Sequence, residues 1–184
     1  MSIIKKILNS LRFLVISPFL DMNNSRLNMD IDRWMSVQHI GGNRKQALKK
    51  LLEKNREFRN LFVFRNTGRP GFCMLARLLY RPLDSLYIMT QEIGGGLYIQ
   101  HGFSTYIAAK SIGENCWINQ QVTIGYKDDT DPPIIGNNVT ITCGAKVLGP
   151  ITIGDNAIIG ANAVVVKDVE PGAVMGGVPA RRIK

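Results

Sequence analysis

Aliphatic residues recur at intervals of six through the second half of the chain. The recurring positions are Ile93, Ile99, Ile112, Ile118, Ile124, Ile135, Ile141, Val147, Ile153, Ile159 and Val165. Two steps are longer, with thirteen residues from Ile99 to Ile112 and eleven from Ile124 to Ile135. A period of six fits neither the turn of an α-helix nor the alternation of a simple strand, and it predicts a parallel β-helix built from hexapeptides.

The residues between the aliphatic positions support this interpretation. Smaller or medium apolar residues follow four positions later and complete a prism-shaped core, at Val122, Val139, Ala145, Ile151, Ala157 and Ala163. Glycine suits tight corners where a side chain would collide or φ is positive, and it follows the aliphatic residue at Gly113, Gly136, Gly154 and Gly160. Asparagine tolerates left-handed backbone and comes two residues later, at Asn115, Asn138, Asn156 and Asn162.

The array is interrupted twice. One residue is inserted between Ile99 and Ile112, and we place it near Thr105–Ile107. The larger interruption is Gly125–Ile134, which contains three acidic residues and two prolines. This segment should leave the prism as an exposed loop, and such loops on rigid scaffolds often carry function.

The first part of the chain follows a helical pattern, so we divide the chain into an α-helical region, residues 1–85, and a β-helix domain with a C-terminal tail, residues 86–184. Asn43 is placed to cap a helix that runs through Arg44–Asn55. Gly68–Gly71 is a break, and the helix after it should end before Pro82.

The positive charge belongs to the helical half. Residues 1–91 contain 16 basic and 6 acidic side chains, whereas residues 92–184 contain 7 and 8. This asymmetry indicates an anionic partner for the first half, such as acidic phospholipid, a polyanionic glycan or a lipid-linked phosphate, unless the surface is merely solvated. No nucleic-acid motif accompanies the charge, so we expect no nucleic-acid partner.

The apolar stretch Ile7–Leu20 is too short to span a membrane and is interrupted by Asn9, Arg12 and Pro18. Two interpretations remain open. It forms an amphipathic helix at a membrane surface, or it packs on its own domain or on a neighbouring subunit. The three cysteines show no paired short spacing, which is typical of reduced thiols, and we expect a cytoplasmic protein, with the inner face of the membrane as one location.

Three runs in the second half resemble the hexapeptide-repeat acyltransferases, and among them most closely the serine acetyltransferases. The runs are IGGGLYIQHGFSTYIAAKSIGENCWINQQVTIGY, CGAKVLGPITIGDNAIIGANAVVVKDV and GGVPARRIK. The resemblance implies a left-handed parallel β-helix and a homotrimer with active sites between neighbouring prisms. It also implies acetyl-CoA as the donor and a hydroxyl or amine as the acceptor.

The resemblance assigns His101 as the catalytic histidine. An imidazole can take the proton of an acceptor hydroxyl and return it to the departing thiolate of CoA. The residue that orients His101 stays open, because the family's aspartate falls at Leu86 here. Asp84 is our first candidate and Glu92 the second, with a backbone carbonyl as the alternative. His101 and His39 are the only histidines, so a metal centre with several histidine ligands is not expected.

The acceptor residues depart from the family pattern. Gln100 replaces the family's aspartate before the histidine, and Asp129–Pro132 replaces its Asp-Arg-His-Pro loop. Acids suit the carboxylate of free serine poorly. Acids and amides suit the hydroxyls of a sugar better, and the candidates are Asn119, Gln120, Asp128 and Asp131.

The resemblance also places CoA along the cleft between prisms, in contact with the turns. Small residues there would permit a close approach, at Gly144, Ala145, Gly160 and Ala161. Cations that could meet the phosphates of CoA are Lys167, Arg181, Arg182 and Lys184.

Three functional hypotheses follow. The first is an acetyl-CoA-dependent O-acetyltransferase that acts on a sugar or surface-polysaccharide precursor. The second is serine O-acetylation for cysteine synthesis. The third is a trimeric scaffold without activity, which the presence of His101 argues against.

Overall fold

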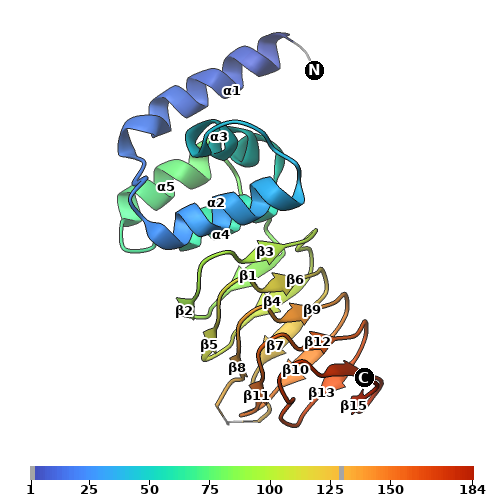
Figure 1. Cartoon of the computed structure of the whole chain (residues 1–184). Coiled ribbons are helices and arrows are strands. Elements are labelled where there is room, and N and C mark those ends of the chain that lie inside the picture. The colour runs from blue at the N-terminus through green and yellow to red at the C-terminus, as the bar shows by residue number, and fades with distance from the viewer. Residues whose placement is uncertain (1–2, 129–130) are drawn as a thin grey trace. The chain divides into compact units, whose positions relative to one another are not determined.

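The computed structural model describes residues 3–128 and 131–184, with side chains from Ile7 onward. The chain forms two compact units, Met1–Leu83 and Asp84–Lys184. The first unit is helical and the second is a parallel β-solenoid of about five coils (Figure 1). The fold class predicted from the sequence is therefore confirmed.

The helical unit contains five α-helices and a short 3₁₀ helix within its described residues. Their bounds are α1 Ile3–Ile16, η1 Ser17–Phe19, α2 Ser25–Val37, α3 Arg44–Lys54, α4 Arg56–Phe64 and α5 Pro70–Leu79. Asn43 caps α3 as predicted, and its side chain and that of Gln46 form a reciprocal capping box. The predicted break at Gly68–Gly71 is shorter than expected, because Pro70 opens α5. Proline suits the first helical position, where an N–H would have no partner in the helix.

The core of the helical unit is apolar around one ion pair. The guanidinium Nε of Arg65 lies 2.7 Å from Oδ2 of Asp30, and the two side chains are only 3% and 0% exposed. Trp34 of α2 packs edge-on against Phe58 of α4, with ring centroids 5.1 Å apart. No helix in the described part of the chain is long and apolar enough to cross a membrane.

The β-helix has three sheets that form the sides of a prism. The five-stranded sheet contains β1 Leu86–Ile88, β4 Thr105–Ile107, β7 Thr123–Gly125, β10 Lys146–Leu148 and β13 Val164–Val165. The four-stranded sheet contains β2 Glu92–Ile93, β5 Ser111–Ile112, β8 Ile134–Ile135 and β11 Thr152–Ile153. The six-stranded sheet contains β3 Tyr98–Ile99, β6 Trp117–Ile118, β9 Thr140–Ile141, β12 Ile158–Ile159, β14 Val174–Gly176 and β15 Arg181–Arg182. Neighbouring strands are parallel, except that β15 pairs antiparallel with β14.

The six-residue pattern corresponds to the core of the prism. Every aliphatic residue of the recurring series is at most 3% exposed, and the second series from Val122 to Ala163 is also buried. The four asparagines predicted to be left-handed have φ between 55° and 61°. The glycines after the aliphatic residues avoid a collision instead. A Cβ on Gly113 would lie 2.6 Å from the backbone of Gly136 in the next coil.

The first interruption lies at a different place from the one predicted. Ile99 pairs with Ile118 and Ile107 with Ile124, so the chain takes eight residues where the next coil takes six. From Ile107 to Ile112 it takes only five. Two extra residues therefore lie in the turn 100–104, and one fewer lies after Ile107. The two changes add up to one extra residue, which the sequence analysis placed near Thr105–Ile107.

Replacing Gly113 by alanine should destabilise the β-helix by about 2 kcal/mol or more, because the added methyl group meets backbone that cannot move without shifting a coil. Gly125 is a matched control, since a Cβ there has no atom within 4 Å. Gly125→Ala should change the free energy of unfolding by less than about 1 kcal/mol. Equilibrium denaturation of both variants makes the comparison, and equal losses would contradict this packing.

Candidate active site

The turns between the six-stranded and five-stranded sheets stack along one edge of the prism, which we call the His101 corner. It consists of residues 100–104, 119–122, 142–145 and 160–163. Backbone hydrogen bonds join these turns, from Gln121 N to Phe103 O at 3.0 Å, from Gly144 N to Gln120 O at 3.1 Å and from Asn162 N to Cys143 O at 2.9 Å. Residues about twenty apart in the sequence therefore lie side by side.

His101 occupies the longest turn of this corner. It has φ 65°, and Gly102 and Ser104 have φ 54° and 52°, so three residues of the turn are left-handed. Such a conformation costs a non-glycine residue of order 1 kcal/mol, and strain of this kind gathers at functional sites. The side chain of His101 is exposed. The two extra residues thus present an imidazole outward from an otherwise rigid prism.

Gln100 is held in place beside His101. Its Oε1 accepts a hydrogen bond from Nε1 of Trp117 at 3.2 Å. The indole ring of Trp117 in turn packs edge-on against Tyr98, with ring centroids 4.6 Å apart. The half-buried amide of Gln100 therefore has a defined orientation next to the imidazole, which suits its predicted role in contacting an acceptor.

The two candidate orienting acids differ in position. Asp84 precedes Ser85, whose carbonyl accepts the N–H of Thr105 at 3.1 Å, so Asp84 belongs to the His101 corner one coil earlier. Glu92 lies in β2 of the four-stranded sheet, away from this corner of the same chain. The role of Asp84 stays a prediction, and its position favours it over Glu92.

The second turn of the corner supplies the predicted amides. Asn119 and Gln120 are half-buried, and Oε1 of Gln120 is buried without a hydrogen-bond partner among the described residues. The structure adds a cation that the sequence analysis did not single out. Nζ of Lys146 donates to the carbonyl of Gln121 at 2.7 Å, which brings an ammonium to the same turn. Its signal in the sequence is a lysine at an outward position of a core strand.

The later turns of the corner are lined by small residues. Gly144, Gly160 and Ala161 are half-buried or exposed. Ala145 is fully buried, so its side chain belongs to the core and only its backbone can reach a ligand. Neighbouring coils are about 4.8 Å apart, so the turn of Gly160 and Ala161 lies roughly 14 Å along the edge from that of His101.

Two predicted residues lie on another edge of the prism, where the five-stranded sheet turns into the four-stranded sheet. Asp131 belongs to the excursion after β7, and its Oδ2 lies 3.7 Å from Nζ of Lys110. Lys167 follows β13 and precedes Val169, which bridges to Ile153 of β11. A single chain therefore does not bring Asp131 or Lys167 to His101. Asp129 and Thr130 lie outside the described residues.

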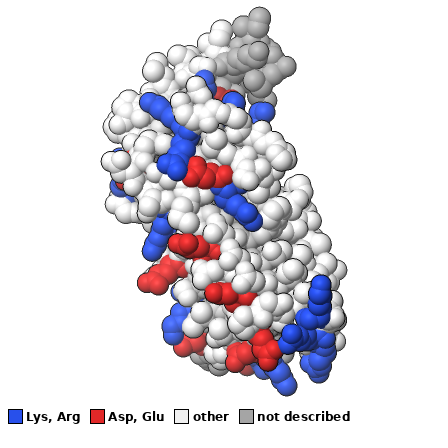
Figure 2. Space-filling model, in the orientation of Figure 1, with Lys and Arg blue, Asp and Glu red and all other residues white. Residues whose placement is uncertain are grey.

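The C-terminal tail continues the His101 corner. The carbonyl of Gly177 accepts the N–H of Val164 at 3.0 Å, and Ala180 N donates to Val164 O at 2.8 Å. Arg181 and Arg182 follow and are exposed. Nη1 of Arg182 lies 2.5 Å from Oε2 of Glu170, so this cation already has a partner. Figure 2 shows basic side chains gathered beside acidic ones at this end of the prism.

Cys116 is a buried core residue and does not supply a nucleophile at the corner. Cys116 is 1% exposed, and its Sγ lies 3.1 Å from the carbonyl of Gly136. Burial raises the pKa of the Cys116 thiol to about 11. Cys143 is half-buried in the turn 142–145. No group of three or more metal-ligating side chains gathers anywhere in the described residues.

Comparison with known proteins shows where this architecture recurs. Residues 132–167 match the family described as bacterial transferase hexapeptide (six repeats). The serine acetyltransferase of Synechococcus elongatus is 41% identical over 96 residues, which are 50% of this chain and 39% of that protein. The chain thus spans less than half the length of this relative.

Two solved structures extend the likeness beyond the repeats. The serine acetyltransferase of Neisseria gonorrhoeae in complex with serine has a TM-score of 0.66 at 25% identity, covering 89% of this chain and 70% of that one. A serine acetyltransferase in complex with CoA has the same score and identity, covering 85% and 68%. Both matches extend into the helical unit, since Asp84–Lys184 alone is a smaller share of the chain.

Cys116 should resist alkylation in the folded protein. With a thiol pKa of about 11, roughly one molecule in a thousand carries the thiolate at pH 8, and burial blocks access as well. Mass spectrometry after iodoacetamide treatment should find Cys116 modified only once the protein is unfolded in denaturant. Modification of Cys116 as fast as Cys143 in the native protein would contradict this assignment.

The same burial predicts a dependence of stability on pH. The folded pKa of Cys116 lies above its ordinary value of 9.0, so the folded state binds the proton more tightly than the unfolded state. The contribution of Cys116 to the free energy of unfolding should therefore be complete below pH 9 and decrease between pH 9 and 11. Denaturation of Cys116→Ser, compared with the unaltered protein, should lack this component.

Proposed function

We propose that this chain, whose second half is a hexapeptide-repeat β-helix similar to that of serine acetyltransferases, is an acetyl-CoA-dependent O-acetyltransferase. The observation that carries the proposal is the exposed imidazole of His101 on a left-handed turn, at the head of a row of turns with small residues. A similar solved structure contains CoA and another contains serine. The row of turns offers the extended edge that CoA needs.

His101 acts as general base in the proposed reaction. Its neutral imidazole takes the proton of the acceptor hydroxyl while the hydroxyl oxygen attacks the thioester carbonyl carbon. The tetrahedral intermediate then collapses with cleavage of the carbon–sulfur bond. The imidazolium returns its proton to the departing sulfur, so the products are the acetyl ester and free CoA. Asp84 is the proposed partner that orients the imidazole.

The residues of this site come from two copies of the chain in the proposed assembly. A threefold arrangement places one edge of each prism against a different edge of its neighbour. The excursion with Asp131, together with Lys167, lies on such a second edge, and it would face the His101 corner of the next copy. The homotrimer thus reunites predicted residues that a single chain keeps apart.

CoA lies along the His101 corner in this proposal. The thioester sits beside His101, and the pantetheine arm passes Gly144, Gly160 and Ala161. Its phosphates lie toward Arg181 at the C-terminal end. Arg181 suits this role better than Arg182, because Arg182 already pairs with Glu170.

L-serine is the acceptor that the comparisons favour, since the similar proteins are named serine acetyltransferases. They favour it over the sugar of a surface-polysaccharide precursor, which the sequence analysis preferred. Lys146 adds physical support, because its ammonium lies one coil from the His101 turn and can pair with the serine carboxylate. It supplies the cation that the loop Asp129–Pro132 lacks.

A sugar hydroxyl stays the second candidate for one specific reason. The neutral amide of Gln100, fixed by Trp117, stands where the resembling family has an acid beside the histidine. An oriented amide can both donate to and accept from sugar hydroxyls. This observation concerns the residue next to the base and is independent of Lys146.

Replacing His101 by alanine should lower kcat by roughly 100- to 10,000-fold, because the acceptor hydroxyl loses its base. Release of free CoA from acetyl-CoA, measured with a thiol reagent, reports the rate. His39→Ala is the matched control, since it alters the only other histidine and lies in the helical unit. An unchanged rate in His101→Ala would remove the proposed base, and no CoA release from the unaltered protein with any acceptor would favour a scaffold.

Lys146→Gln should raise the KM for L-serine by about tenfold or more, whereas Lys146→Arg should keep most of the affinity. With an N-acetylhexosamine as acceptor, the KM should be the same in the unaltered protein and in both Lys146 variants. Rapid turnover with the sugar and none with serine would reverse the order of the two acceptors. Equal KM values in the three proteins would remove Lys146 from the acceptor site.

A further inference from the structure

Helix α1 turns its apolar side outward. The exposed fractions of Ile7, Leu8, Leu11, Leu14 and Val15 lie between 46% and 68%. By the geometry of an α-helix these side chains share an arc of roughly 120°. The inward side of the helix includes Asn9, which is 7% exposed, and Ile16, which is fully buried. A surface helix of a globular protein normally has the reverse arrangement.

Helix α5 extends this apolar area. Met74 and Leu78, one turn apart on α5, are 74% and 81% exposed. Helix α1 contacts α5, and the ring of Phe19 lies 6.5 Å from that of Phe72. We call the exposed apolar residues of these two contacting helices, namely the five of α1 together with Phe19, Met74 and Leu78, the α1–α5 surface. Large exposed apolar areas mark interaction sites.

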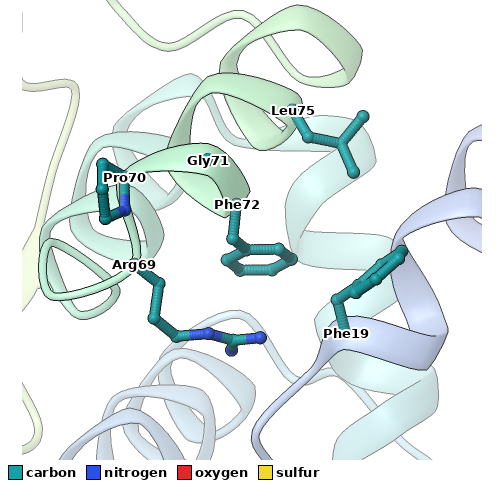
Figure 3. Close-up of a pocket in the computed structure, with 6 residues that line it drawn as sticks. All are labelled: Phe19, Arg69, Pro70, Gly71, Phe72 and Leu75. Atoms are coloured by element: carbon teal, nitrogen blue, oxygen red, sulfur yellow. The ribbon is translucent and has the colours of Figure 1, made fainter.

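A cavity with a cation adjoins the α1–α5 surface. It has a volume of about 370 Å³ and is lined by Phe19, Arg69, Phe72 and Leu75 with the first turn of α5. Figure 3 shows the side chain of Arg69 extending past the Phe72 ring toward Phe19. The guanidinium carbon lies 4.5 Å from the centroid of that ring. No carboxylate pairs with Arg69 among the described residues, so an apolar pocket and an available cation stand side by side.

The charges around this surface have one sign. Helices α1 and α5 contain the basic residues Lys5, Lys6, Arg12 and Arg77 and no acidic residue. The whole of residues 1–83 contains 16 basic and 5 acidic residues. Of the acids, Asp30 is buried with Arg65 and Asp32 is paired with Arg44. The helices that form the apolar surface therefore contain basic residues and no acidic residue.

We propose that the α1–α5 surface docks on an anionic phospholipid bilayer. The leucines and isoleucine of α1, with Met74 and Leu78, enter the boundary between headgroups and acyl chains. Arg69 meets a lipid phosphate at the mouth of its pocket, and Arg77 adds attraction to the negative surface. A second copy of the chain is a poorer occupant, because it would oppose positive charge with positive charge. The proposal does not depend on the acetyl-transfer function.

Flotation of the full chain with vesicles tests the proposal. Vesicles of phosphatidylcholine mixed equally with phosphatidylglycerol should bind the protein, and vesicles of phosphatidylcholine alone should bind it much more weakly. Arg69→Gln and Arg77→Gln should each weaken binding to the anionic vesicles about fivefold. The double variant Leu14→Gln with Met74→Gln should weaken it tenfold or more, because two exposed apolar anchors are lost.

Met89→Gln is the matched control, since Met89 is an equally apolar methionine, 61% exposed, in the β-helix unit. It should bind vesicles like the unaltered protein. Thermal unfolding should be the same in all variants, since each altered side chain is exposed. No binding of the unaltered protein to anionic vesicles would overturn the proposal. A larger assembly in sedimentation velocity that the Leu14 and Met74 changes abolish would also overturn it, by showing a second copy on this surface.

Discussion

The stacking of each coil on the next is the constraint on which the rest of the β-helix depends. A single coil buries too little apolar surface to be stable, so the aliphatic residues of each coil must pack against those of its neighbours. Backbone hydrogen bonds between coils keep the register, and the glycines after the core positions let the coils approach. The corners of successive coils are thereby forced into straight rows. Because residues distant in sequence become neighbours along such a row, the stacked turns can form an extended binding site.

Much of this architecture could be predicted from the sequence, because the core positions repeat at one fixed interval. The aliphatic series, the buried second series and the left-handed asparagines all follow from side-chain size and backbone sterics. The placement of the extra residues between Ile99 and Ile112 could not be predicted in the same way. The sequence shows only that thirteen residues separate Ile99 from Ile112. It takes the pairing of Ile107 with Ile124 to show that the extra length lies in the turn of His101.

The residues of the candidate site that lie in the turns of the His101 corner could be predicted from the sequence, and the others less well. The turns bring Gln100, His101, Asn119 and Gln120 together, and the smaller residues of later coils follow along the same edge. Asp131 and Lys167 are on another edge, which a linear pattern of hexapeptides does not reveal. Lys146 could not be predicted, because its side chain extends to the carbonyl of Gln121 in the preceding coil. That contact depends on the conformation of a long side chain.

The helical unit is not built from repeats, and its most informative feature is the apolar side of α1 that faces solvent. Its interior is an ordinary apolar core around the Arg65–Asp30 pair. Helix α1 nevertheless exposes leucines and buries an asparagine. Two functions thus occupy two units of the chain, with proposed chemistry in the row of turns and proposed membrane contact on the helices.

The central claim is that the His101 corner holds acetyl-CoA, and a crystal structure of the protein with CoA tests it most directly. The thiol of CoA should lie beside the His101 imidazole, with the pantetheine arm along the turns of Gly144 and Ala161 and the phosphates toward Arg181. CoA bound along a different edge of the prism, or with its thiol remote from His101, would contradict the claim.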